Sequence, residues 1–325
     1  MNTEKNITTQ TRLTDNIYAG LEKKPVLYGI FALLIVAVLL VPQFANNYLL
    51  EIFTNTWFYI VLCLGLNIVV GYAGLLDLGY AAFFAIGAYT TGILSSQFGM
   101  NFWLTLPFSI LFSALSGVII GGPTLRLRSD YLAIVTLGFG EIIRIAARNL
   151  SITGGASGLI GIERPYLFGI YLSKIHHFYY LFFLLVILAV IVSYRLHYSR
   201  LGRAWQYIRE DEDAAEAMGI NRVQIKLYAF VIGAIFGGMA GSFYAIKMTA
   251  ISPETFVFTQ SAMILLAVVL GGMGKIPGVI LGACALVLFP EIFREIGQMR
   301  MLLFGIVLLI IMIFRPQGIW PERRN

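Results

Sequence analysis

Two charged side chains stand three residues apart in an otherwise apolar stretch of the sequence. Glu141 and Arg144 fall within residues 131–149, and a helix would place them on one face. Ionised groups at membrane depth are costly and are usually paired with each other. The spacing therefore predicts an intramembrane ion pair. The alternatives are a role in a polar path through the protein or a contact with an external partner.

Glycines interrupt a second apolar stretch, which also contains polar residues. Broken helices expose backbone groups, and a membrane tolerates this only inside the protein or along a wet cavity. Free helix ends can also bind a carboxylate or an ammonium group. The pattern predicts a path for a small solute, lined by Asn67, Gly71, Gly74 and Asp77. Close packing of neighbouring helices is the alternative for the glycines, and a position near the cytoplasmic turn between two spans is the alternative for Asp77.

A charged segment, Ser199–Arg222, separates two long apolar stretches and contains four basic and five acidic residues. Its first half has the i, i+3, i+4, i+7 spacing of an amphipathic helix. The apolar positions are Leu201, Ala204, Trp205 and Ile208. A hydrophobic protein that holds such a segment in water is expected to present it to a soluble partner.

The second half of this segment has the signals of a short helix. Asp213 is placed to cap it, with Glu216 three residues later in a capping-box-like pair. Gly219 can then end the helix, because glycine readily adopts positive φ. An ordinary capped loop is the alternative to a docking surface.

Sequence patterns for catalysis, metal binding and nucleotide binding are absent. Cys63 and Cys284 lie in apolar runs, where a thiol is usually a small buried hydrophobe. Gly274-Lys275 is followed by Ile276, where a P-loop needs Ser or Thr. We therefore expect no catalytic residue, no metal site and no cofactor in this chain. The chain therefore cannot bind ATP through a P-loop.

The composition places the chain in a bilayer. Of its 325 residues 58% are hydrophobic and 12% are charged, and a soluble domain has roughly 25% charged residues. The predicted fold class is an all-α polytopic membrane protein with about ten spans. The candidate segments are 26–42, 52–70, 78–97, 102–122, 131–149, 177–195, 223–246, 259–272, 277–290 and 301–314. Eight spans are the alternative, because the last three segments are short.

The distribution of basic residues predicts the orientation. With a cytoplasmic N-terminus, most Lys and Arg residues fall in inner segments, as the positive-inside rule requires. The predicted arrangement is a cytoplasmic tail at 1–25, a membrane domain at 26–315 and a second cytoplasmic tail at 316–325. Residues 199–222 then lie in the cytoplasm. The net charge of +6 is assigned to inner loops and not to nucleic-acid binding.

Several motifs together resemble those of one membrane-protein family. Asp213-Ala-Ala-x-x-x-Gly219 is similar to the E-A-A-x-x-x-G loop of bacterial ABC importer permeases, with Asp in place of Glu. Further similar segments are Gly71–Gly79, Ala81–Tyr89, Ser129–Gly138, Thr153–Gly158 and Leu270–Gly278. Their order and spacing over most of residues 55–315 resemble the LivM-type member of the branched-chain amino acid permeases.

The resemblance implies a type II ABC importer-like permease in the cell inner membrane. It implies that Asp213, Ala214, Ala215 and Gly219 couple to the ATPase subunits. The implied partners are a second, LivH-type permease subunit, two ATP-binding subunits and an extracytoplasmic solute-binding protein. The implied cargo is leucine, isoleucine and valine.

Other functions remain as alternatives. The same machine could import urea, short amides or other amino acids. A different class is a secondary transporter that works alone, although such carriers usually show more intramembrane acidic residues. A membrane-embedded enzyme would need a nucleophile–base set or a metal cluster.

Overall fold

The computed structural model describes residues 38–124, 129–167 and 170–294, together with isolated positions after residue 294. The chain forms two compact units, Met1–Leu50 and Glu51–Asn325. In the first unit, residues 38–44 are helical and α3 begins at Asn47. The rest of the architecture belongs to the second unit.

The described chain is almost wholly helical, as predicted. The long apolar helices are α3 (Asn47–Asn67), which continues into a π-helical turn η1 (Ile68–Tyr72), α5 (Phe102–Thr124), α7 (Ile175–His197) and α10 (Arg222–Met248). The other membrane-type helices are α4 (Ala81–Ser96), α6 (Ser129–Asn149), α11 (Phe258–Gly271) and α12 (Ile276–Ile292). These eight helices coincide with eight of the ten predicted segments. Segments 26–42 and 301–314 lie mostly outside the described residues.

A break separates α3 from α4, where glycines interrupt the apolar stretch. Residues 73–80 have no regular helix, and α4 begins at Ala81, within the predicted segment 78–97. Together with η1, residues 73–80 form the break between α3 and α4. Gly74 in the break has φ of 70°, a conformation that a helix does not use.

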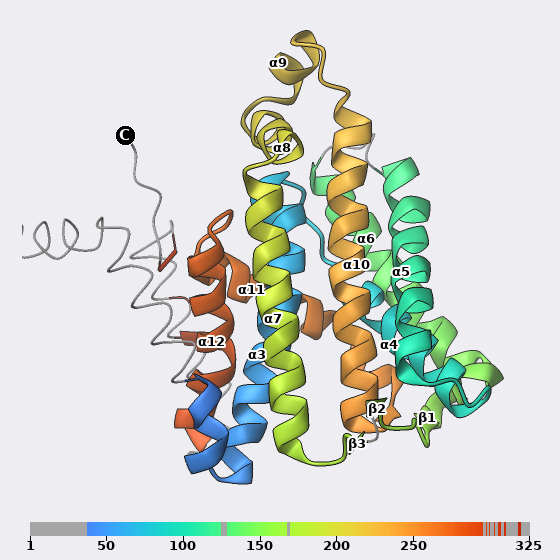
Figure 1. Ribbon diagram of the computed structural model, residues 1–325. Coiled ribbons are helices and arrows are strands. Elements are labelled where there is room, and N and C mark those ends of the chain that lie inside the picture. The colour runs from blue at the N-terminus through green and yellow to red at the C-terminus, as the bar shows by residue number, and fades with distance from the viewer. Residues whose placement is uncertain are drawn as a thin grey trace, which may run out of the picture. The chain divides into compact units, whose positions relative to one another are not determined.

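Helix α10 packs along α4 and α5 through small residues (Figure 1). A Cβ atom on Gly87 of α4 would lie 2.1 Å from the Gly238 carbonyl oxygen of α10. Ser242 donates a hydrogen bond of 2.6 Å to the Ser109 hydroxyl of α5. This is the close packing that membrane helices use in place of large interdigitating side chains.

The outer helices carry exposed apolar side chains. Ile119 on α5 is 71% exposed and Leu184 on α7 is 63% exposed, whereas Leu62 and Leu64 on α3 are fully buried. Large exposed apolar residues are unfavourable in water but suit the hydrocarbon of a bilayer. The burial pattern therefore agrees with a multi-pass membrane protein.

The two ends of α7 and α10 carry different structures (Figure 1). At one end the chain continues from α7 through α8 (Arg200–Glu210) and α9 (Glu212–Ala217) into α10. At the other end lie the short strands and 3-10 turns, which were not predicted. They are η2 (Ser151–Thr153), η3 (Gly155–Ser157), β1 (Leu159–Ile160), β2 (Tyr166–Leu167), β3 (Ile170–Tyr171), β4 (Ala250–Ile251) and η4 (Pro253–Phe256), with β1 antiparallel to β4 and β2 antiparallel to β3.

Candidate functional site

The charged segment Ser199–Arg222 folds as two capped helices, as its spacing predicts. The Ser199 hydroxyl accepts a hydrogen bond of 3.1 Å from the Gly202 amide and so caps α8. Trp205 and Ile208 are buried on one face of α8. The apolar spacing in the sequence therefore identified the face that packs on the rest of the chain.

The cap of α9 is Asp211, and the prediction of Asp213 was wrong. The Asp211 carboxylate accepts hydrogen bonds of 2.9 and 3.0 Å from the amides of Asp213 and Ala214. Asp211 has an extended backbone between α8 and α9, which is the conformation of an N-cap residue. Asp213 lies in the first turn instead, where its carboxylate is 3.4 Å from Arg222 Nη1. Gly219 follows the helix with φ of 85°, as expected of a residue that ends it.

The predicted coupling residues point in different directions. Asp213, Ala214 and Gly219 are exposed, whereas Ala215 is only 5% exposed and packs inward. Met218, which was not predicted, is 85% exposed at the C-terminal end of α9. An exposed methionine beside small residues suits contact with another protein, because its unbranched side chain adapts to irregular surfaces.

Two buried contacts fix this segment to α10, in addition to the ion pairs of Arg222 with Asp213 and Glu216. The Trp205 indole N–H donates a hydrogen bond of 2.7 Å to the Ile225 carbonyl. The Lys226 ammonium, which is almost fully buried, forms an ion pair with Glu212 at 2.5 Å. These contacts hold α8 and α9 against the start of α10.

The break between α3 and α4 lies beside α8. Its residues alternate, with Gly74 exposed and Leu75 and Asp77 buried, which is the pattern of an extended chain with one accessible face. The Asp77 carboxylate accepts a hydrogen bond of 2.9 Å from the Gly79 amide. Asp77, a predicted lining residue of the solute path, therefore faces the protein interior.

The other predicted path residues meet at one point. All three lie close to Arg209 of α8 and to Gly274 in the turn between α11 and α12. We call this group of five the glycine junction: Asn67, Gly71, Gly74, Arg209 and Gly274. The Asn67 side-chain oxygen accepts a hydrogen bond of 2.8 Å from the Gly274 amide. Arg209 Nη1 donates a hydrogen bond of 2.6 Å to the Gly71 carbonyl. These partners lie far apart in the sequence, and the prediction missed both contacts.

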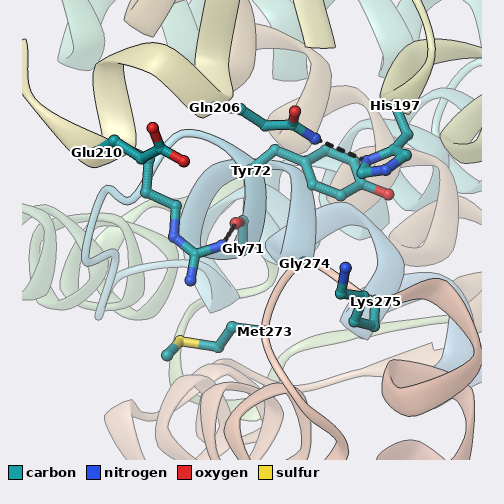
Figure 2. Close-up of a pocket in the computed structure, with 9 residues that line it drawn as sticks. Gly71, Tyr72, His197, Gln206, Glu210, Met273, Gly274 and Lys275 are labelled. Atoms are coloured by element: carbon teal, nitrogen blue, oxygen red, sulfur yellow. Dashed lines mark hydrogen bonds between the residues drawn. The ribbon is translucent and has the colours of Figure 1, made fainter. Parts of the chain in front are cut away.

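The glycine junction is tightly packed on one side and open on the other. A Cβ atom on Gly71 would lie 2.0 Å from the Asn67 side-chain oxygen and 2.5 Å from the Gly274 amide nitrogen. A polar cavity of about 270 Å³ adjoins it (Figure 2). The cavity is lined by Gly71, Tyr72, His197, Gln206, Arg209, Glu210, Met273, Gly274 and Lys275. Asn67 itself is fully buried.

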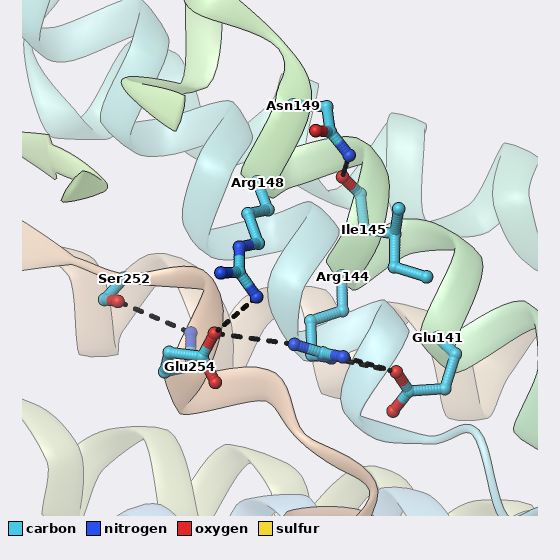
Figure 3. A network of polar contacts seen from close by, with 7 residues as sticks. All are labelled: Glu141, Arg144, Ile145, Arg148, Asn149, Ser252 and Glu254. Carbon is cyan, nitrogen blue, oxygen red and sulfur yellow. Dashed lines mark hydrogen bonds and ion pairs between the residues drawn. The ribbon is translucent and has the colours of Figure 1, made fainter. Parts of the chain in front are cut away.

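Glu141 and Arg144 are in contact and belong to a larger network (Figure 3). Arg144 Nη2 lies 2.8 Å from Glu141 Oε2, and Arg144 Nε donates to the same oxygen at 2.9 Å. Glu254 of η4 is 3.5 Å from Arg144 Nη1 and 3.7 Å from Arg148 Nη1. The network thus joins α6 to η4. The prediction missed Glu254, which is distant in the sequence.

Within residues 38–124, 129–167 and 170–294, no group of three or more His, Cys, Asp or Glu side chains is arranged to hold a metal ion.

Comparisons with known proteins agree with the sequence resemblance. A family model described as "Branched-chain amino acid transport system / permease component" matches residues 48–315. The chain is 44% identical to the high-affinity branched-chain amino acid transport system permease protein LivM of Salmonella typhimurium, over 91% of this chain and 75% of that protein. It is also 44% identical to LivM of Escherichia coli K12, over 90% of this chain and 74% of the relative.

A second type of permease is also similar to the chain. The high-affinity branched-chain amino acid transport system permease protein LivH of Escherichia coli K12 is 30% identical over 38% of this chain and 41% of its own length. No solved structure matches the chain.

Proposed function

The chain belongs to the family of branched-chain amino acid transport system permease components, and on that premise we propose that it is one transmembrane subunit of an ATP-driven importer of leucine, isoleucine and valine. Relatives named LivM, which are 44% identical, support the cargo. A LivH-type subunit would form the other half of the solute path. The chain itself is not an enzyme in this proposal, and ATP–Mg would bind to the partner subunits.

The observation that carries this proposal is the exposed tip of the charged segment. α8 and α9 lie beyond the ends of α7 and α10 (Figure 1), and they present Asp213, Ala214, Met218 and Gly219 outward. An ATP-binding subunit would dock on this tip. Ala215 would act indirectly, because it packs α9 on its own chain.

The proposal also fixes the orientation of the subunit in the membrane. Residues 199–222 lie in the cytoplasm, as do both termini, because basic residues are concentrated in these segments. The end with the short strands then faces the extracytoplasmic solute-binding protein, which would supply most of the selectivity.

The docking role is tested by co-purification of the complete complex from membranes. Met218→Arg should reduce the amount of bound ATPase subunit by about tenfold, since it places a charge in an apolar contact. Met248→Arg is the matched control, because Met248 is also exposed but lies at the opposite end of α10. Normal recovery of the ATPase subunit with Met218→Arg, in a protein that still melts cooperatively, would disprove docking at this tip.

The cargo is tested separately, in proteoliposomes that contain the complete complex and the solute-binding protein. Labelled leucine should accumulate only with ATP inside the compartment that holds the ATPase subunits, and labelled urea should not accumulate. Uptake of leucine without ATP would favour a secondary transporter. Uptake of urea but not of leucine would mean that the chain belongs to an ATP-driven importer of a different solute.

A further inference from the structure

We propose that Arg209 is the positioning residue that carries movement of the docked segment Ser199–Arg222 to the glycine junction. The inference rests on the proposed docking of an ATPase subunit, but it does not depend on the identity of the cargo. Arg209 would act by its hydrogen bond to Gly71, and not by contact with the solute.

The hydrogen bond from Arg209 to Gly71 lies at the C-terminal end of a helix, where a positive charge is stabilising. The π-helical turn η1 ends at Tyr72, and the carbonyl groups at a helix end need partners from outside the helix. The amides of Ala73 and Leu75 bond the Ile68 and Val69 carbonyls, and the Gly71 carbonyl is bonded by Arg209. The C-terminal end of a helix also carries partial negative charge. The Arg209 guanidinium satisfies the Gly71 carbonyl at 2.6 Å, and a charge-assisted bond of this kind is stronger than a neutral one.

Arg209 follows the anchor of α8 by one helical turn. Trp205 holds α8 to α10 by its bond to Ile225, and its ring stacks on Tyr72 of η1, with ring centroids 6.4 Å apart and planes at 13°. Arg209 adds a directional bond to the same turn of η1. Because of these two contacts, α8 could not move without also displacing the end of η1.

The Arg209 side chain also lies close to the turn between α11 and α12. A Cβ atom on Gly274 would lie 3.1 Å from Arg209 Nη1, and one on Gly74 would lie 2.9 Å from Arg209 Cγ. Gly274 is in turn bonded to Asn67 at the end of α3. One arginine thus contacts the break after α3 and the turn between α11 and α12, so both can follow a single movement of α8.

The experiment measures movement at the break in the complete complex. A cysteine is introduced by Leu76→Cys, since Leu76 is a half-buried residue of the broken segment, in a Cys63→Ser, Cys284→Ser background. Its rate of modification by a maleimide is compared with and without ATP and vanadate. The same comparison is made with Tyr207→Cys on α8, where the side chain is exposed and which reports movement of the docked segment itself.

Three substitutions are then added to each cysteine variant. Arg209→Ala removes the bond, and Arg209→Lys keeps the charge with a shorter side chain. Arg203→Ala is the matched control, because Arg203 is on the same helix and also donates to a carbonyl, that of Tyr198 at 3.1 Å, but at the junction of α7 and α8.

We expect ATP to change the modification rate at both cysteines in the parent and in Arg203→Ala. Arg209→Ala should keep the response of Tyr207→Cys and reduce that of Leu76→Cys by about tenfold, with partial recovery in Arg209→Lys. ATP-dependent uptake should fall with the Leu76→Cys response, although the ATPase subunit still co-purifies.

An unchanged response of Leu76→Cys in Arg209→Ala would overturn the inference. So would a parent complex in which Tyr207→Cys responds to ATP and Leu76→Cys does not. Loss of the ATPase subunit from the parent complex would instead refute the proposed docking. If both cysteines respond to ATP but leucine is not imported, only the proposed cargo would be refuted.

Discussion

At the scale of the residue, Gly71 is the position where the break has least room. Its missing side chain leaves space for the Asn67 oxygen and the Gly274 amide, and the latter is backbone that cannot rotate away. We expect Gly71→Ala to lower the free energy of unfolding by about 2 kcal/mol, a typical cost of overpacking. Thermal unfolding of the purified protein measures this loss, and uptake should fall with it.

Gly122→Ala is the control for this substitution. Gly122 lies in α5, and a Cβ atom there would meet no heavy atom within 4 Å. Alanine is the better helix former, so this variant should melt at or slightly above the parent temperature. Equal melting temperatures for the two variants would mean that the glycine junction accommodates the extra methyl group. The close contacts at Gly71 would then contribute nothing measurable to the free energy of unfolding.

At the scale of the element, the ion-pair network links α6 to η4 and so to the start of α11. Arg144→Met leaves Glu141 and Glu254 without their shared cation, whereas Arg144→Met with Glu141→Gln removes the charge on both helix positions. We expect the single variant to be less stable than the double by about 1 kcal/mol. The cost is modest because the Glu141 side chain, which the single variant leaves unpaired, is 33% exposed.

Thermal unfolding in lipid nanodiscs compares these variants. Arg148→Met serves as control, since Arg148 is half exposed and touches Glu254 only at 3.7 Å, so its loss should change the melting temperature little. A double variant less stable than Arg144→Met would mean that the Glu141 carboxylate stabilises the fold even without Arg144, which would contradict the expected cost of an unpaired charge.

Elements of this fold were predictable where the signal is local. The spacing of Trp205 and Ile208 indicated the buried face of α8, and Gly219 marked the end of α9. The cap of α9 was misassigned because several neighbouring acidic side chains can each cap a helix. Only the backbone conformation, extended at Asp211, decides among them.

The candidate site was predictable only in part, because its contacts are not local. Glycines indicated a break after α3, but nothing near Asn67 indicates that its partner is the amide of Gly274. Arg209 lies four residues after Trp205, so the sequence places it one turn further along nearly the same face of α8. Its target, the Gly71 carbonyl, is a backbone group and carries no side-chain signal in the sequence.

At the scale of the whole molecule, the proposed orientation places the two ends of the second unit on opposite sides of the membrane. Met218 of the charged segment and Ile160 of β1 are both highly exposed, at 85% and 75%. In the Cys63→Ser, Cys284→Ser background, Ile160→Cys should react with a membrane-impermeant maleimide on intact cells. Met218→Cys should react only in inside-out vesicles.

The orientation decides whether the coupling proposal can hold. ATP is available on the cytoplasmic side, so a docking tip must face it, and the basic residues of Ser199–Arg222 predict that it does. Each cysteine controls for the other, because they report opposite faces with the same reagent. If Met218→Cys reacts on intact cells while Ile160→Cys is protected, the tip faces away from ATP. Arg209 would then have no docked subunit from which to receive movement.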